Sequence, residues 1–191
     1  FGMALVSGIS KKHLFLVFGV GALAFFALWI SVFQPYQKAR IVNFLNPLTD
    51  IHGSGYNAYQ STIAVGSGQL LGKDVGFGTQ SRLKFLPEYE TDFVFSAFAE
   101  EWGFVGSLLL LLLFSALIWR ILSIAMVGTT NFEILFGLGV AIFFTSHIII
   151  NIGMNIGILP VTGITLPFMS YGGSHLVTEF AALGILSSMK R

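Results

Sequence analysis

The chain has 191 residues, of which 54% are hydrophobic and only 10% are charged, and its mean hydropathy is +0.81. Soluble domains carry about 25% charged residues, so this composition indicates an integral membrane protein. The net charge of +1 argues against a nucleic-acid partner, and the lack of cysteine in these residues excludes disulfides and thiol chemistry.

Four apolar segments predict membrane spans. Residues 14–33 and 134–152 are long enough to cross a hydrocarbon core of about 30 Å. Residues 93–119 form a further span that ends before Arg120, and residues 174–189 form a shorter, weaker one. The sequence therefore predicts an all-α, polytopic transmembrane bundle of about four spans in a single membrane domain. We expect it to be part of a longer membrane protein, because so few spans make a small scaffold.

Basic residues lie at alternate ends of these spans, and lysine and arginine mark cytoplasmic ends. The residues concerned are Lys11, Lys12, Arg120, Lys190 and Arg191. This pattern predicts that both chain ends are cytoplasmic and that the loops 34–92 and 153–173 are extracytoplasmic.

Both outer loops are expected to be structured. The first contains apolar stretches that predict short interfacial helices, with glycine turns between them. The stretches are residues 41–45, 56–65 and 85–86, and the turns are residues 66–68 and 76–78. The second loop is apolar yet contains Pro160 and Pro167. Since non-helical backbone at membrane depth is tolerated only inside protein or beside water, we expect this loop to line a cavity.

Five of the nine acidic residues gather at the start of the second span: Glu88, Glu90, Asp92, Glu100 and Glu101. A carboxylate near hydrocarbon costs several kcal/mol unless it is paired, hydrated or used. Asp92 is either an acid favoured by the dipole of the following helix or a functional carboxylate at the membrane boundary. For Glu100 and Glu101, pairing with basic groups is favoured over catalysis.

Other motifs have simpler readings. Residues 171–174 begin the last span and form either an anion site at a helix start or a plain turn. Asn151 and Asn155 share a helix face, where packing and side-chain hydrogen bonds explain them. The segment 66–73 fails as a phosphate loop, because Ser67 replaces a required glycine and Asp74 follows Lys73.

Two long motifs resemble the SEDS family of membrane proteins (RodA, FtsW and SpoVE). GSGQLLGKDVGFGTQSRLKFLPEYETDFVFSAFAEEWGFVG, residues 66–106, resembles their large extracellular loop and the following span. NIGMNIGILPVTGITLPFMSYGGSHL, residues 151–176, resembles their last loop and final helix. The form of residues 78–81, GTQS, is more similar to the RodA branch. SEDS proteins have ten spans, and this chain resembles their C-terminal half.

The resemblance implies a peptidoglycan glycosyltransferase of the bacterial cytoplasmic membrane. Such an enzyme polymerises lipid II, a lipid-linked disaccharide-pentapeptide, into β-1,4 glycan strands at the outer face for cell elongation and shape. The resemblance also implies a class B penicillin-binding protein as partner, within an elongation complex of further membrane proteins. The family's essential acid is the aspartate of Thr-Asp-Phe, which falls on Asp92.

A single key carboxylate suits this chemistry. The donor sugar leaves on a charged pyrophosphate, so no general acid is needed, unlike glycoside hydrolysis. The acceptor 4-hydroxyl needs a base, which Asp92 can supply in an inverting displacement. A divalent cation (Mg or Mn) is a further candidate for holding the pyrophosphate. The candidate substrate-binding residues are Lys73, Gln80, Arg82, Lys84, Glu88, Thr91, Ser170, Gly172, Gly173 and Ser174, with Glu100 and Glu101 in support.

Two other classes of function stay open. An acid at membrane depth beside a broken segment also suits a lipid flippase or transporter. A non-catalytic scaffold that positions the penicillin-binding protein is the second alternative.

Overall fold

The computed structural model describes residues 10–34, 37, 44, 54–83 and 85–189, and the regular elements in these ranges are all α-helices. The predicted all-α class is therefore confirmed. Three helices are long and apolar enough to cross a membrane: residues 12–31 of α2 (Lys11–Ser31), α6 (Val94–Met126) and α7 (Asn131–Asn155). At a rise of 1.5 Å per residue, the 16 residues of α8 (Gly173–Ser188) span about 24 Å, so its crossing stays a prediction.

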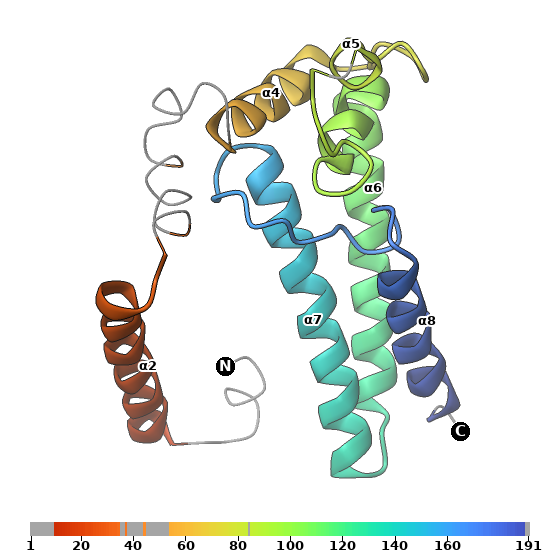
Figure 1. Ribbon diagram of the computed structural model, residues 1–191. Helices are drawn as coiled ribbons and strands as arrows, with labels where there is room; N and C mark the ends of the chain where they lie inside the picture. The colour runs from red at the N-terminus through yellow and green to blue at the C-terminus, as the bar shows by residue number, and fades with distance from the viewer. Residues whose placement is uncertain (1–9, 35–36, 38–43, 45–53, 84, 190–191) are drawn as a thin grey trace.

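The helices α6, α7 and α8 form one bundle, in which α6 and α7 are antiparallel neighbours (Figure 1). Their shared core contains Phe114, Ile121, Phe144 and Leu186. The helices α4 (Ser54–Ser67) and α5 (Thr79–Arg82) lie at the end of the bundle where α6 begins (Figure 1). The helices of the first loop therefore lie at the same end of the bundle as the start of α6.

The first loop is partly helical, as expected. The predicted helix over residues 56–65 is confirmed by α4. The turn expected at 66–68 starts only at residue 68, because α4 continues through residues 66 and 67, and of the segment 76–78 only residue 76 lies in a turn. Residues 85–86 were expected in a helix, but they are a bend whose Leu86 is buried against Ala64 and Phe93. The predicted helix over 41–45 lies outside the described residues, apart from Phe44.

Helix α2 stands apart from the bundle in Figure 1, and none of its apolar window is buried. Side chains such as Phe15 and Leu23 are exposed along its length. A helix that is apolar all round needs lipid or further protein as its surroundings. This exposed surface fits a membrane environment.

Two helices extend beyond the bounds of the predicted spans. The second span was expected to stop at Trp119, but α6 continues through Arg120 to Met126. Arginine is a good helix former, so the charge marks a change of environment and not the end of the helix. The α6–α7 connection is set instead by Thr130, which accepts a hydrogen bond from the Glu133 backbone N–H in a capping box. Helix α7 therefore begins before residue 134.

Helix α6 is interrupted at Gly103, whose φ of 66° and ψ of −164° are accessible almost only to glycine. The loop after α4 fills the break. Phe104 N–H donates to Gln69 O at 2.9 Å, and Lys73 N–H donates to Glu100 O at 3.0 Å. The glycine-rich segment 66–73, which fails as a phosphate loop, therefore supplies the backbone partners that α6 loses at its kink.

Candidate functional site

Asp92 lies half-buried in the turn that precedes α6, directly before the buried Phe93. Its carboxylate lies against Gly163 in the second outer loop. A Cβ atom at Gly163, whose φ is +73°, would be only 3.3 Å from Asp92 Oδ2. The loops 34–92 and 153–173, far apart in the sequence, thus meet at Asp92, and a side chain at residue 163 would crowd its carboxylate.

The residues before Asp92 are tied to the residues before α8. Ser170 is buried, and its hydroxyl donates to Thr91 O at 2.7 Å while accepting from the Leu166 N–H at 2.8 Å. The Tyr171 N–H donates to Glu90 O at 2.8 Å. Ser170, a predicted substrate-binding residue, therefore has both of its hydroxyl functions occupied by protein groups.

A cavity of about 630 Å³ lies between these two segments and the first turns of α6. Tyr89, Glu90, Glu101, Ser170, Gly172 and Gly173 are among the residues that line it. The second loop thus lines a cavity, as expected from its prolines, although Asp92 is not among the lining residues. The hydrogen bond with Glu90, more than its charge or burial, raises the pKa of Tyr89 above its usual value.

Lys73 and Glu100 form an ion pair with Nζ and Oε1 2.9 Å apart. The Glu100 side chain is 0% exposed and Lys73 is 30% exposed. Glu100 also accepts from Thr79 Oγ1 at 3.0 Å and from the Gln80 N–H at 3.1 Å. The preference for pairing over catalysis at Glu100 agrees with this geometry. Lys73, predicted to bind pyrophosphate, is already engaged by a carboxylate.

The other predicted residues are spread around Asp92. Thr91 Oγ1 donates to Glu88 Oε2 at 3.0 Å, and Glu101 Oε1 accepts from the Gly76 N–H at 3.1 Å. Arg82 is exposed at the end of α5. Gly172, Gly173 and Ser174 lie at the start of α8. Lys84 lies outside the described residues.

A buried cluster lies at the start of α8. The sequence predicted His147 as an interhelical partner, which its contact with His175 fits, but it gave no role to His175 and Glu179. Glu179 accepts from the Phe168 N–H at 3.0 Å, and its Oε1 lies 2.8 Å from His175 Nδ1. The His147 ring packs edge-on against His175, with centroids 5.4 Å apart. Phe168 has a positive φ of 62°. The four-residue spacing of His175 and Glu179 was the available signal, and the cluster anchors the second loop to α7 and α8.

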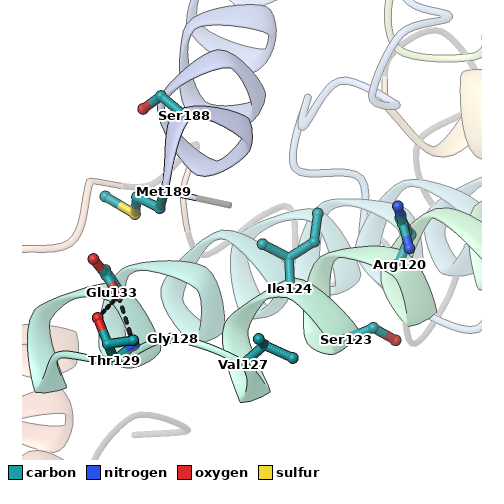
Figure 2. A pocket seen from close by; sticks show the side chains of 9 residues that line it. All are labelled: Arg120, Ser123, Ile124, Val127, Gly128, Thr129, Glu133, Ser188 and Met189. Carbon is teal, nitrogen blue, oxygen red and sulfur yellow. Dashed lines mark hydrogen bonds between the residues drawn. The ribbon is translucent and has the colours of Figure 1, made fainter. Parts of the chain in front are cut away.

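A second hollow, of about 820 Å³, lies at the opposite end of the bundle (Figure 2). Arg120 and Ser123 of α6 line it together with Ser188 and Met189 at the end of α8. Glu133 also faces it, but its Oε2 is hydrogen-bonded to the Thr129 backbone and hydroxyl in the α6–α7 connection. The Glu133 carboxylate thus stabilises the turn between α6 and α7.

Within the described ranges, no three histidine, aspartate or glutamate side chains come together as a metal site. The divalent cation considered above stays a prediction, and no step is assigned to one.

The fold and the site together define a polytopic helical membrane protein with a carboxylate where two structured loops meet at one end of its bundle. The family model for FtsW, RodA and SpoVE, described as "Cell cycle protein", matches residues 1–191. The chain belongs to this family.

Several relatives carry names that describe an activity or a cellular process. The chain is 42% identical to stage V sporulation protein E of Bacillus subtilis over 191 residues, which are 99% of this chain and 51% of that one. It is 46% identical over 162 residues to peptidoglycan glycosyltransferase MrdB of Escherichia coli K12, covering 85% of this chain and 44% of that one. The chain thus spans about half the length of these relatives.

The fold also matches a solved structure that is described as "Structural coordination of polymerization and crosslinking by a peptidoglycan synthase complex". The TM-score is 0.73 at 33% identity, over 97% of this chain and 51% of the other. The similarity therefore covers nearly all of this chain.

Proposed function

We propose that this chain is the C-terminal half of a peptidoglycan glycosyltransferase that polymerises lipid II at the outer face of the bacterial cytoplasmic membrane. Family membership and the names of the relatives support the activity. The observation that carries the assignment to a residue is the position of Asp92, whose carboxylate lies where the two outer loops meet. Asp92 is then the catalytic base.

The chemistry needs a proton acceptor and little else from this side chain. Asp92 takes the proton of the acceptor sugar 4-hydroxyl as that oxygen attacks the anomeric carbon of the donor. The bond from that carbon to the lipid pyrophosphate breaks, and the pyrophosphate leaves as an anion with the electron pair. Because an α-linked donor becomes a β-1,4 product, a single inverting displacement accounts for the stereochemistry.

The cavity beside Ser170 is a candidate subsite for one of the sugars. It is lined by polar and aromatic groups, among them Tyr89 and Glu90. Among the predicted pyrophosphate ligands, Arg82 is exposed, whereas Lys73 is held by Glu100. We therefore favour Arg82 over Lys73 for direct contact with the phosphates.

The decisive experiment measures lipid II polymerisation by the purified full-length protein and its Asp92→Asn variant. The loss of the base should lower the rate by about 10²–10⁴ or more while folding is retained. Asp74→Asn is a matched control, because Asp74 lies exposed in the same loop with a φ of +71°, which asparagine tolerates. Normal glycan strands from Asp92→Asn would exclude the proposed role.

The same variant separates the two alternatives. A flippase would move labelled lipid II across proteoliposome membranes and lose that transport in Asp92→Asn. A pure scaffold would show neither activity and would be indifferent to the change.

The proposed orientation places Asp92 outside and Arg120 in the cytoplasm, since basic residues favour the cytoplasmic side. Leu71 lies in the loop that packs beside the kink of α6 and Val127 follows the last residue of α6, and they are 80% and 75% exposed. Single Leu71→Cys and Val127→Cys variants are made in a full-length background from which any other cysteine has been removed. They are treated with an impermeant thiol reagent on intact cells. We expect labelling at position 71 alone. Labelling at position 127 alone would show the opposite orientation and contradict the proposal.

We also propose that the single span of a class B penicillin-binding protein packs on α6 and α7. A groove of about 320 Å³ between these helices is lined by apolar side chains and by the small polar residues Ser115 and Thr145. Membrane helices associate through close packing at small residues. Ser115→Phe should therefore weaken co-purification of the partner. Ser123→Phe, in the hollow at the far end, is the control.

Glycine 137 is unsuitable for that test, although its small size suggests an interface. A Cβ atom there would lie 2.6 Å from Ala125 Cβ and 3.1 Å from Leu186 Cδ1. Gly137 therefore packs inside the α6–α7–α8 bundle, and a larger residue would disturb the bundle itself.

A further inference from the structure

Three successive backbone carbonyls, those of Glu90, Thr91 and Asp92, are each held by a group from the second half of the chain. The first two accept from Tyr171 N and Ser170 Oγ, as described above. The third, Asp92 O, accepts from two side-chain amides of α7: Asn151 Nδ2 at 3.0 Å and Asn155 Nδ2 at 3.1 Å. Asp92, the proposed base, therefore has the backbone carbonyl with the most hydrogen bonds of the three.

Asn151 and Asn155 are both 0% exposed and lie one turn apart on α7. The orientation of the Asn155 amide follows from its other contacts. Its Oδ1 accepts from both the N–H and the hydroxyl of Ser96, so its Nδ2 must face Asp92 O. Ser61 of α4 completes the network through a 2.6 Å contact with the Ser96 hydroxyl and a 2.8 Å hydrogen bond to Asn155 O.

Asn151 connects Asp92 to the opposite wall of the site. The same Nδ2 that donates to Asp92 O also donates to Ile164 O at 2.8 Å. Ile164 follows Gly163, the residue against which the Asp92 carboxylate lies. One amide therefore fixes the spacing between the backbone of the base and the loop that its carboxylate faces.

We infer that Asn151 and Asn155 are positioning residues. By holding the backbone carbonyl of Asp92, they fix the position of its carboxylate. The inference rests on the proposed function, in which Asp92 is the base. With its carbonyl fixed, the Asp92 side chain can move only by rotation about its own two torsions. Since a displacement of about 1 Å can cost about 10²-fold in rate, loss of these amides should reduce catalysis without removing any group that touches substrate.

The test uses Asn151→Leu, which keeps the branched shape and removes both donors, and Asn151→Gln, which keeps an amide. Each is introduced into the full-length protein. Lipid II binding, the single-turnover polymerisation rate and thermal unfolding are measured. The control is Ser107→Ala, which removes another buried hydrogen bond of the bundle, from Ser107 Oγ to Gly103 O at 2.8 Å.

The expected result for Asn151→Leu is a rate about 10–100-fold lower, with lipid II binding changed by less than about threefold. Asn151→Gln should recover part of the rate, and Ser107→Ala should retain it. A folded Asn151→Leu protein with a normal rate would overturn the inference. An equal loss of binding and rate, or the loss of the unfolding transition in both Asn151 variants, would also overturn it, because the residue would then hold the whole bundle.

A second measurement does not depend on activity. A thiol is placed by Asp92→Cys, with Asp74→Cys as the reference position, in a full-length background from which any other cysteine has been removed. Adding Asn151→Leu should change the rate of labelling by a small soluble reagent at position 92 by threefold or more, and leave position 74 unchanged. Unchanged labelling at position 92 would contradict the inference. An active Asp92→Asn protein would instead contradict the proposed function and leave the labelling result intact.

Discussion

The two ends of the α6–α7–α8 bundle hold their polar groups in different ways. At the end where α6 begins, the groups that surround Asp92 and Glu100 are paired across long sequence separations, from α4 to α6, α7 and the second loop. At the end where α6 stops, Glu133 accepts hydrogen bonds from Thr129 and Thr130, its neighbours in the chain. The hollow there is nevertheless larger, at about 820 Å³ against 630 Å³.

This difference in hydrogen bonding distinguishes a functional site from a hollow that is merely large. A buried polar group costs free energy unless it is satisfied, so a network that joins distant segments is retained where geometry matters. An empty hollow needs no such network of hydrogen bonds, whatever its volume. The Asp92 end is therefore the end at which position is controlled, and the opposite end is a turn with space beside it.

The largest effect on stability should come from Glu100. Glu100→Ala leaves the Lys73 ammonium and the Gln80 N–H without their acceptor. We expect a loss of about 3 kcal/mol, at the low end of the range for a broken buried pair, because Lys73 remains partly in water. Thermal or denaturant unfolding in detergent measures it. Glu101→Ala, next along the chain, removes only the bond from the Gly76 N–H and should have a much smaller effect.

The kink in α6 gives the next largest effect. Gly103→Ala should cost at least about 1–3 kcal/mol, because its backbone conformation excludes a side chain and a Cβ atom would lie 2.3 Å from Gly72 N. The matched control is Gly184→Ala in α8, where no atom lies within 4 Å of the added methyl group. If both changes proved equally harmless in unfolding experiments, the loop would not depend on the kink.

The opposite end should respond weakly. Thr130→Ala removes the acceptor that caps α7 and should cost about 1 kcal/mol, with polymerisation unchanged. Unfolding experiments measure the loss of stability, and a polymerisation assay measures the activity of the same variant. A large drop in activity from this variant would mean that the two ends are functionally coupled.

Sequence reasoning recovered the elements better than their connections. Hydropathy located α6 and α7, and two prolines indicated the non-helical segment before α8. The charge at Arg120 does not mark the end of α6, because arginine is compatible with a helix that extends beyond the apolar run. The actual boundary depends on the cap at Thr130, a local signal that was present in the sequence.

The meeting of two loops at Asp92 was expected from the sequence, but its contacts were not, and the catalytic role of Asp92 stays a prediction. The position of Asp92 between two loops followed from its place before an apolar run and from the family motif. That Lys73 pairs with Glu100 could not be predicted, since several basic residues lie in the same loop. The approach of Asn151 and Asn155 to Asp92 O depends on how α7 packs beside α6, which helical spacing alone does not fix.

The central claim is that chemistry resides at the Asp92 end, and one paired measurement tests it most directly. The same carboxylate-to-amide change is made at each end, as Asp92→Asn and as Glu133→Gln, and the single-turnover rate of lipid II polymerisation is compared. Glutamine serves in a capping box as glutamate does, so Glu133→Gln should stay within about twofold of the unaltered protein. Asp92→Asn should fall by about 10² or more. A fall in Glu133→Gln together with a normal rate in Asp92→Asn would contradict the account.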